Sequence, residues 1–336
     1  MASGIRWGLV GASDIAATRV APTMRALGQS VSAVCSGSPD RADWFARQHG
    51  IPLATSSLEQ LLAADIDAVY ISSRNAEHAG QARAAAAASK HVLLEKPIAT
   101  TLEDATAVVR DCESAGVVLA ANHHLPGAGT HRRIRDLVAS GAIGRPLSAA
   151  VRHAVMLPER LRGWRLSDEP GAGVILDITV HDAAVLNALF GGAALEVSAL
   201  GVRQGSWQAG SDDAAMVTLR YPGDVLAQTH DAFTSAFTPT RLEVHGDSGS
   251  ITAPGVMTQD PVGQVFLADA SGEREVEVAD RRDLYEVALS EFEAAVRGTG
   301  RPAVTGREGL AAYAVAQAAL ESAQSHRSVA VPPLSP

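Results

Sequence analysis

The first third of the chain alternates short apolar runs with amphipathic stretches, and this alternation constrains the fold more than any other feature. Five runs have strand character, at residues 5–10, 30–36, 67–72, 91–95 and 117–122. Helical patterns lie between them, at residues 14–27, 39–50, 58–64, 77–89 and 102–116. Buried strands that alternate with helices form a parallel sheet covered on both faces. We therefore predict an N-terminal α/β domain of the Rossmann type, a doubly wound parallel sheet, over residues 1–124.

The pattern changes after about residue 125. A helix that ends at Gly141 is expected from residue 130 and a long strand at 146–157, and short strand-like runs then follow one another from 194 to 279. Strands that succeed one another without helices pair antiparallel. Residues 125–336 are therefore predicted to form a C-terminal α+β domain with a large, open, mostly antiparallel sheet. A final helix at 307–325 is expected to pack back on the first domain.

A glycine-rich turn follows the first predicted strand in WGLVGASDIAATRV. Gly11, Ser13 and Ala16 occupy the three positions of the dinucleotide fingerprint G-x-G-x-x-G/A, with Ser in place of the second Gly. Such a turn lets the backbone approach a pyrophosphate, and the following helix supplies unpaired N–H groups. We predict a dinucleotide site whose contacts in this segment are Gly8, Gly11, Ala12, Ser13 and Ile15.

The end of the second strand, AVCSGSPDRA, indicates which dinucleotide binds. An NAD site places an Asp or Glu at the strand end to hold the ribose 2′-hydroxyl, and no carboxylate occupies that position here. It offers Ser36 and Ser38, followed by Arg41 at the head of the next helix. Hydroxyls and a guanidinium suit a 2′-phosphate, so we predict NADP(H) as the cofactor.

Two further motifs carry ionisable side chains suited to carbonyl chemistry. The strand at 91–95 ends in Glu95-Lys96-Pro97, and ligands of open α/β sheets bind outside the carboxyl ends of the strands. The apolar segment 171–191 carries Asp177, His181 and Asp182, and the i,i+4 spacing of Asp177 and His181 puts them on one helical face.

The expected roles follow from the chemistry of these groups. A His can donate a proton near neutral pH, and a Lys can stabilise the alkoxide that forms when a carbonyl is reduced. Asp177 would orient the imidazole or hold a substrate hydroxyl. Upstream, Arg162, Trp164 and Arg165 offer an aromatic face and forked donors suited to a polyol.

Together, GLVGASDIA, EKP and GAG-x-x-x-D-x-x-x-H resemble the Gfo/Idh/MocA oxidoreductase family over essentially the whole chain. The resemblance implies catalytic roles for Lys96, Asp177 and His181, and substrate contacts by these three together with Arg162 and Trp164. The cofactor contacts that it implies beyond the glycine turn and Ser36, Ser38 and Arg41 are Ser72, Asn75, His78, Glu95, Lys96, Asn122, Trp164 and Arg165. The implied activity is NADPH-dependent reduction of a sugar ketone, with 1,5-anhydro-D-fructose as leading substrate and 1,5-anhydro-D-mannitol as product. Segment 203–212 departs from the expected pattern and is expected to line the substrate side.

Composition narrows the classes of partner. The formal net charge is −9 without a block of Lys or Arg, so neither a nucleic acid nor an anionic membrane is an expected partner. No apolar run reaches the ~18 residues of a membrane span, and a cytoplasmic location is expected. Cys35 and Cys112 are expected to be reduced and buried. The expected ligand is a sugar or polyol, no metal site is predicted, and a homo-oligomer through the open sheet face stays an option.

Three alternatives remain at this point. The nearest is an inositol or aldose dehydrogenase that uses NAD(P) in the oxidative direction. The others are a cofactor-binding regulator without chemistry and a glycosidase that uses a nicotinamide for transient oxidation.

Overall fold

The computed structural model describes residues 4–207 and 210–334, which form two compact units. Unit 1 contains the chain up to His124 together with Tyr285–Leu310, and unit 2 contains Leu125–Leu284 and the chain from Ala311 onward. The two units are described separately below.

Unit 1 is built on a six-stranded, wholly parallel sheet with the strand order β3-β2-β1-β4-β5-β6. This order is that of the doubly wound dinucleotide-binding fold. The strands are β1 (Arg6–Val10), β2 (Ser30–Cys35), β3 (Leu53–Thr55), β4 (Ala68–Ile71), β5 (His91–Leu94) and β6 (Leu119–Ala121). The predicted α/β architecture is confirmed, and β3 is a strand that the apolar pattern did not reveal.

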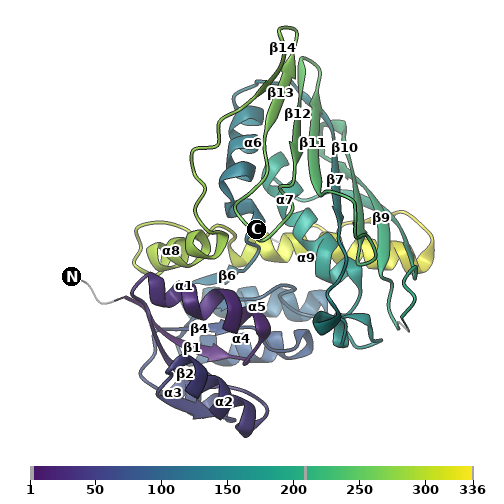
Figure 1. Cartoon of the computed structure of the whole chain (residues 1–336). Coiled ribbons are helices and arrows are strands. Elements are labelled where there is room, and N and C mark those ends of the chain that lie inside the picture. The colour runs from purple at the N-terminus through teal and green to yellow at the C-terminus, as the bar shows by residue number, and fades with distance from the viewer. Residues whose placement is uncertain (1–3, 208–209, 335–336) are drawn as a thin grey trace. The chain divides into compact units, whose positions relative to one another are not determined.

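Helices connect the strands of unit 1 and enclose the sheet (Figure 1). They are α1 (Ala21–Ala26), α2 (Pro39–His49), α3 (Leu58–Ala63), α4 (His78–Ala87) and α5 (Leu102–Ser114). Ser38, Ser57 and Thr101 cap α2, α3 and α5, because each side chain accepts a hydrogen bond from a backbone N–H of the first turn. The expected helix at 14–27 is interrupted, since a π-helical turn, Ala16–Val20, precedes α1.

Helix α8 (Leu284–Val296) contributes to the core of unit 1, far along the chain from the sheet strands. The ring of Phe292 lies 5.1 Å from that of Trp7 on β1, and both side chains are fully buried. The indole N–H of Trp7 donates to Gln29, whose amide in turn donates to Glu293 on α8. Residues 285–310, assigned from the sequence to the C-terminal part of the chain, thus complete the first unit.

Unit 2 is built on a nine-stranded mixed sheet with the order β14-β13-β12-β11-β7-β10-β9-β8-β15. The pair β7–β10 is parallel and the other pairs are antiparallel. The strands are β7 (Pro146–Ala154), β8 (Glu196–Val202), β9 (Ala214–Tyr221), β10 (Val225–Ala232), β11 (Arg241–Gly246), β12 (Gly249–Pro254), β13 (Phe266–Asp269), β14 (Gly272–Glu275) and β15 (Val329–Ala330). The predicted large, mostly antiparallel sheet is confirmed.

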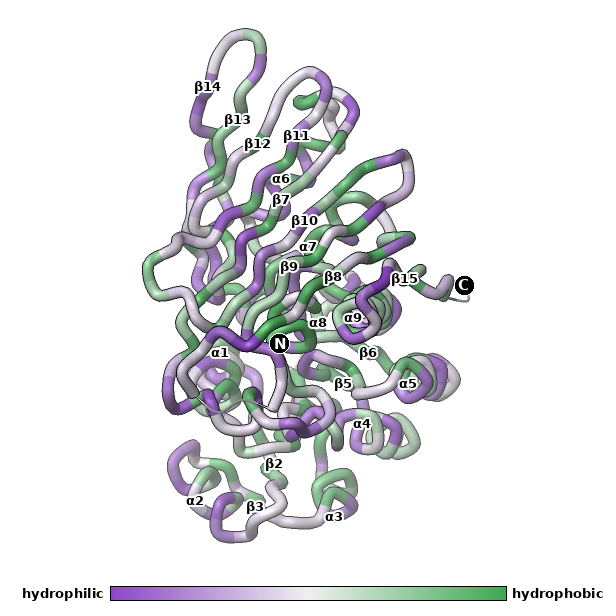
Figure 2. The backbone as a smooth tube through the Cα atoms, turned by 90° about the vertical axis from the view of Figure 1, so that its right-hand side faces the viewer, coloured by the Kyte–Doolittle hydropathy of each residue, from purple (hydrophilic) through white to green (hydrophobic). Residues whose placement is uncertain are grey.

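One face of this sheet carries helices α6 (Gly129–Ala139) and α7 (Val180–Phe190), as Figure 1 shows. Side chains along β9 and β10 alternate between buried and exposed, which is the period of a strand with one covered face. Figure 2 shows the same alternation as changes of hydropathy along the strands. Leu200, Met216 and Leu226 point to the open face and are more than half exposed. Helix α9 (Gly306–Ser325) begins in unit 1 and ends in unit 2.

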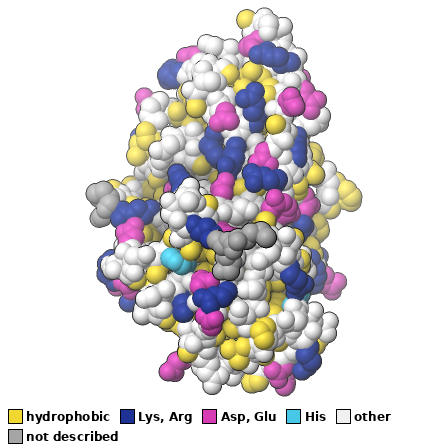
Figure 3. Space-filling view, turned by 90° about the vertical axis from the view of Figure 1, so that its left-hand side faces the viewer, with side chains coloured by type: hydrophobic (Ala, Val, Ile, Leu, Met, Phe, Trp, Pro, Cys, Tyr) yellow, Lys and Arg dark blue, Asp and Glu magenta, His cyan; other side chains and the backbone are white. Residues whose placement is uncertain are grey.

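Charged side chains of both signs are interspersed on the face that Figure 3 shows. Cys35 and Cys112 are buried free thiols, as expected from the sequence. No helix within residues 4–207 and 210–334 is long and apolar enough to cross a membrane.

Candidate functional site

The glycine turn of unit 1 lies at the carboxyl end of β1, between the ends of β2 and β4. The backbone N–H of Gly11 donates to the carbonyl of Cys35 at 2.8 Å, and Gly11 has a φ of +107°. A Cβ at Gly11 would lie 2.8 Å from backbone atoms of Ser72 and Ser73, so glycine is required for both conformation and space. The Ser13 hydroxyl lies 2.7 Å from that of Ser72 and accepts from the N–H of Ala16.

The other residues predicted in this turn differ in exposure. Ala12 and Ile15 are half-buried, and both pack against the apolar core of unit 1. Gly8 lies inside β1, where a Cβ would meet Leu61 and Ile66 at 2.8–2.9 Å. The structure thus gives Gly8 a packing function beneath the turn.

The residues predicted to select the cofactor follow β2. Ser36 is buried and its N–H donates to Thr55, while Ser38 caps α2 by accepting from the N–H of Arg41 at 3.4 Å. The Arg41 side chain is exposed at the start of α2. Arg41 therefore stands in the first turn of α2, next to Asp40, while the end of β2 itself carries Ser36 and no carboxylate.

Glu95 of the EKP motif lies in a network of buried polar groups. The Tyr70 hydroxyl donates to Glu95 Oε1 at 2.7 Å, and the Asn122 amide donates to the same oxygen at 2.6 Å. Burial raises the pKa of Glu95, and the two hydrogen bonds and the charge of Lys96 oppose this shift. Tyr70 belongs to β4, Glu95 follows β5 and Asn122 follows β6. The network therefore joins the ends of three strands beside Lys96. Tyr70 had not been singled out from the sequence, since it reads there as an ordinary strand residue.

Two buried imidazoles lie around Lys96. His78 is 1% exposed, and its Nδ1 lies 2.8 Å from the carbonyl oxygen of Pro97. Burial lowers the pKa of His78 and lowers that of His123 to about 3, and the charge of Lys96 acts in the same direction on both. Both rings are therefore neutral at neutral pH, and Lys96, which is half-buried, is the cation of this cluster. The ring of His78 therefore lies in the interior, against Pro97, and not at the surface. Asn75, in the turn before α4, and Ser72 are also buried.

In unit 2, Asp177 and His181 lie one turn apart at the start of α7. Asp177 is in a π-helical turn, Ile175–Thr179, that runs directly into α7, and π-helical turns inside helices are frequent at functional sites. Asp177 is 7% exposed and His181 is 6% exposed. The Nε of Arg165 donates to Asp177 Oδ2 at 3.1 Å, so the buried carboxylate has a cationic partner.

The aromatic and guanidinium groups predicted upstream of α7 form two stacked pairs. The Arg165 guanidinium lies 4.7 Å from the ring centre of Trp164, and that of Arg162 lies 4.6 Å from the ring of Trp207. Trp207 belongs to the segment 203–212, whose residues 208–209 lie outside the described residues. Trp207 was missed among the candidate side chains, because contact with Arg162 joins residues 45 positions apart and leaves no local signal.

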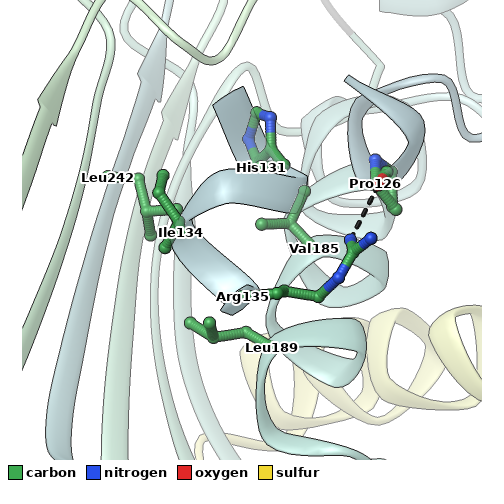
Figure 4. Close-up of a pocket in the computed structure, with 7 residues that line it drawn as sticks. All are labelled: Pro126, His131, Ile134, Arg135, Val185, Leu189 and Leu242. Carbon is green, nitrogen blue, oxygen red and sulfur yellow. Dashed lines mark hydrogen bonds between the residues drawn. The ribbon is translucent and has the colours of Figure 1, made fainter. Parts of the chain in front are cut away.

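A small cavity also lies in unit 2, between α6, α7 and β11 (Figure 4). Arg135 donates to the carbonyl of Pro126 at its edge, at 2.7 Å. The residues that line it are Pro126, His131, Ile134, Arg135, Val185, Leu189 and Leu242. None of the predicted substrate residues is among them, so this cavity belongs to the core and not to the candidate site.

Comparison with known proteins identifies the family. Residues 5–123 match the family model described as oxidoreductase family, NAD-binding Rossmann fold, and residues 131–252 match the GFO/IDH/MocA C-terminal domain. The chain is 45% identical to 1,5-anhydro-D-fructose reductase of Ensifer adhaerens, over 97% of this chain and 98% of that protein. The chain belongs to the Gfo/Idh/MocA family of oxidoreductases. The expected family is thereby confirmed.

Other proteins extend the comparison. The chain is 29% identical to D-xylose 1-dehydrogenase (NADP(+)) 2 of Haloferax volcanii, over 96% of this chain and 98% of that protein. KijD10, a 3-ketoreductase of Actinomadura kijaniata solved with NADP and TDP-benzene, superposes with a TM-score of 0.84 at 26% identity, over 95% of this chain and 98% of that chain. An aldose-aldose oxidoreductase of Caulobacter crescentus shares the fold, with a TM-score of 0.88 at 22% identity, over 97% of this chain and 99% of that chain.

The geometry of unit 1 fits the nicotinamide dinucleotide that this family binds. At Gly11 there is no space for a Cβ, so the backbone can approach a ligand at the strand ends. The Asn122 Oδ1 is buried and has no donor among the residues that the structure describes. The hydroxyls of Ser13, Ser36 and Ser72 add polar groups at the same edge of the sheet.

Proposed function

We propose that this protein is an NADPH-dependent reductase of a sugar ketone, with 1,5-anhydro-D-fructose as the substrate and 1,5-anhydro-D-mannitol as the product. The observation that carries the proposal is the 45% identity to the Ensifer adhaerens reductase along almost the full length of both chains. The candidate residues of both units lie within the matched length.

Preference for the phosphorylated cofactor is supported by the residues after β2. Ser36, Ser38 and Arg41 supply hydroxyl and guanidinium donors, and no carboxylate occupies the end of β2, where an NAD site holds the ribose 2′-hydroxyl. The glycine turn would hold the pyrophosphate, with Gly11 and Ser13 as its backbone contacts. When bound, the cofactor supplies the hydride for reduction.

The protein groups would manage the proton and the developing charge. Lys96 polarises the substrate carbonyl and stabilises the alkoxide, for which an ammonium beside neutral His78 and His123 is well suited. His181 donates the proton, and Asp177 orients the imidazole or holds a sugar hydroxyl. Arg165 holds Asp177 in place through the 3.1 Å contact.

The deciding experiment is a substrate panel with matched variants. Purified protein is assayed with NADPH and NADH against 1,5-anhydro-D-fructose, ketoses and aldoses, and with NADP⁺ and NAD⁺ against inositols and aldoses. Lys96→Met and His181→Gln should each lower turnover by on the order of 10²–10⁴-fold while NADPH binding is retained. The double variant should be little worse than either single one, because residues that act on one reacting centre are not additive. Full turnover in either single variant would refute the assignment of that residue.

A second candidate is oxidation of an aldose with NADP⁺. The relationship to the D-xylose dehydrogenase, 29% identity over 96% of this chain, is the observation in its favour. The same panel distinguishes the two, since the alternative requires faster oxidation of an aldose than reduction of 1,5-anhydro-D-fructose.

A further inference from the structure

Unit 2 contains a cluster of buried polar side chains that the proposed chemistry does not use. The cluster lies between β7, β10 and the start of α7, on the face of the sheet that α7 covers. Asp182 and Asp231 are completely buried, and the other members are at most 8% exposed. Its members are His153, Thr179, Asp182, Thr229 and Asp231.

Two sets of hydrogen bonds hold the cluster, one between β7 and α7 and one between β10 and the π-helical turn before α7. His153 Nδ1 on β7 is hydrogen-bonded to Asp182 Oδ1 on α7 at 2.7 Å. Asp231 Oδ2 on β10 accepts from Thr179 and from Thr229, at 2.5 and 2.8 Å. His153 and Asp231 are directly opposite each other in the parallel pair β7–β10, so the two strands present both groups to the helix.

One oxygen of each carboxyl group lacks a donor. Asp182 Oδ2 and Asp231 Oδ1 are both buried, and neither has a hydrogen-bonding partner among the described residues. The two carboxyl groups are near enough that each shifts the pKa of the other. Two carboxylates cannot hydrogen-bond to one another, but a carboxylic acid and a carboxylate can, and a single proton would then satisfy both oxygens.

The surroundings of Asp182 and Asp231 favour binding of a proton by the pair. Burial raises the pKa of Asp182 to about 7, and burial together with the neighbouring Asp182 raises the pKa of Asp231 well above its usual value. The other titratable groups that face the cluster add no cation at neutral pH. Burial lowers the pKa of His131 on α6 to about 3, and burial keeps the Tyr221 hydroxyl on β9 protonated by raising its pKa.

The cluster is attached to the chain on both sides of His181. Thr179 precedes His181 by two residues and Asp182 follows it directly. Thr179 is tied to β10 and Asp182 to β7, at the junction between the π-helical turn and α7. The backbone that carries His181 is therefore fixed to two neighbouring strands by buried hydrogen bonds.

We propose that Asp182 and Asp231 share one proton and, with His153 and Thr179, form a positioning network that sets the orientation of His181. This inference rests on the proposed function of His181 as the proton donor. Small displacements of a proton donor are costly, since misplacement by about 1 Å lowers rates by on the order of 10²-fold. The network acts through His181 and does not touch the substrate.

Two substitutions at one position test the network. Asp231→Asn keeps an oxygen for the threonine hydroxyls and offers Asp182 a permanent amide donor, so kcat should stay within about 3-fold of the wild type. Asp231→Val removes both functions and should lower kcat by on the order of 10²-fold, with the dissociation constant of NADPH unchanged. If Asp231→Val does not fold, Thr179→Val removes one link to the same carboxylate and should lower kcat in the same direction.

A matched control separates positioning from stability. Tyr221 on β9 donates to Asn187 near the other end of α7, at 2.9 Å. Tyr221→Phe removes a buried hydrogen bond from the same helix and should lower stability without changing kcat. A kcat for Asp231→Val equal to that of Tyr221→Phe would overturn the positioning role. An Asp231→Asn variant as slow as Asp231→Val would overturn the shared proton.

An observable independent of turnover keeps this test separate from that of the proposed function. In protein labelled with ¹⁵N histidine, the imidazole signals of His181, assigned with His181→Gln, should shift in Asp231→Val and remain in place in Tyr221→Phe. Infrared spectra at neutral pH should show a protonated carboxyl band that Asp231→Asn removes. If no sugar is reduced but both signals behave in this way, the proposed function fails and the network stands. Unchanged His181 signals, or no such band, would overturn the network whatever the activity.

Discussion

Gly11 offers the sharpest test of the cofactor site. Its backbone conformation and the lack of space for a Cβ both require glycine, and comparison with two other glycines of unit 1 separates these two constraints. Gly11 combines a φ of +107° with backbone atoms 2.8 Å from a Cβ. Gly28 has a φ of +72° but nothing within 4 Å, and Gly37, beside Ser36 and Ser38, has nothing within 4 Å and no positive φ. Substitution by Ala therefore tests both constraints at Gly11, backbone strain alone at Gly28, and neither constraint at Gly37.

The expected magnitudes follow from these geometries. Gly37→Ala should leave stability unchanged or raise it by up to about 1 kcal/mol. Gly28→Ala should cost about 1–2 kcal/mol for the left-handed backbone. Gly11→Ala should cost about 1–3 kcal/mol for strain and about 1–3 kcal/mol for overpacking, so about 2–6 kcal/mol in all.

Only Gly11→Ala should also weaken the binding of NADPH. An ordinary Cβ contact begins at 3.4 Å, so contacts at 2.8 Å require the chain to move by 0.6 Å, the difference between the two. A shift of this size exceeds the ~0.5 Å tolerance of a preorganised site, and the dissociation constant of NADPH should rise at least about tenfold. Urea unfolding and fluorescence titration with NADPH measure the two effects. The reasoning fails if Gly11→Ala matches Gly28→Ala in stability and binds NADPH as tightly as the wild type.

Three further predictions concern charge. Arg41→Ala should raise the dissociation constant of NADPH by about 10–100-fold, because it removes a charge-assisted hydrogen bond, and should leave that of NADH unchanged. Equal weakening of the binding of both cofactors would exclude a contact between Arg41 and the 2′-phosphate. Arg165→Met should lower kcat/KM for the sugar by about tenfold or more, because it removes the cationic partner of the buried Asp177 carboxylate; steady-state kinetics decide. His123 has a pKa of about 3 in the folded protein and 6.5 in the unfolded chain, so the free energy of unfolding should fall as the pH falls from about 6.5 toward 3. His123→Asn should reduce this loss of stability, as measured by urea unfolding at several pH values. An unchanged pH dependence would contradict the lowered pKa of His123.

Much of unit 1 was predictable from local sequence. Strand and helix periods and the fingerprint around Gly11 each involve residues close together in the chain, and the structure places these elements as the patterns indicate. The antiparallel character of most of unit 2 was predictable for the same reason, since turns between successive strands leave local signals. The pairing of β7 with β10 was not, because these strands are separated by α7 and two other strands.

The sequence by itself determined which chemistry is available: a glycine turn, an ammonium after β5, and a carboxylate and an imidazole at i,i+4 spacing. Only the tertiary structure decided what surrounds these groups. It packed α8 against Trp7, buried His78 against Pro97, stacked Arg162 on Trp207 and joined His153 to Asp182. Each of these contacts joins residues that are distant in the chain, and burial and pairing over such separations arise from packing, which no local period records.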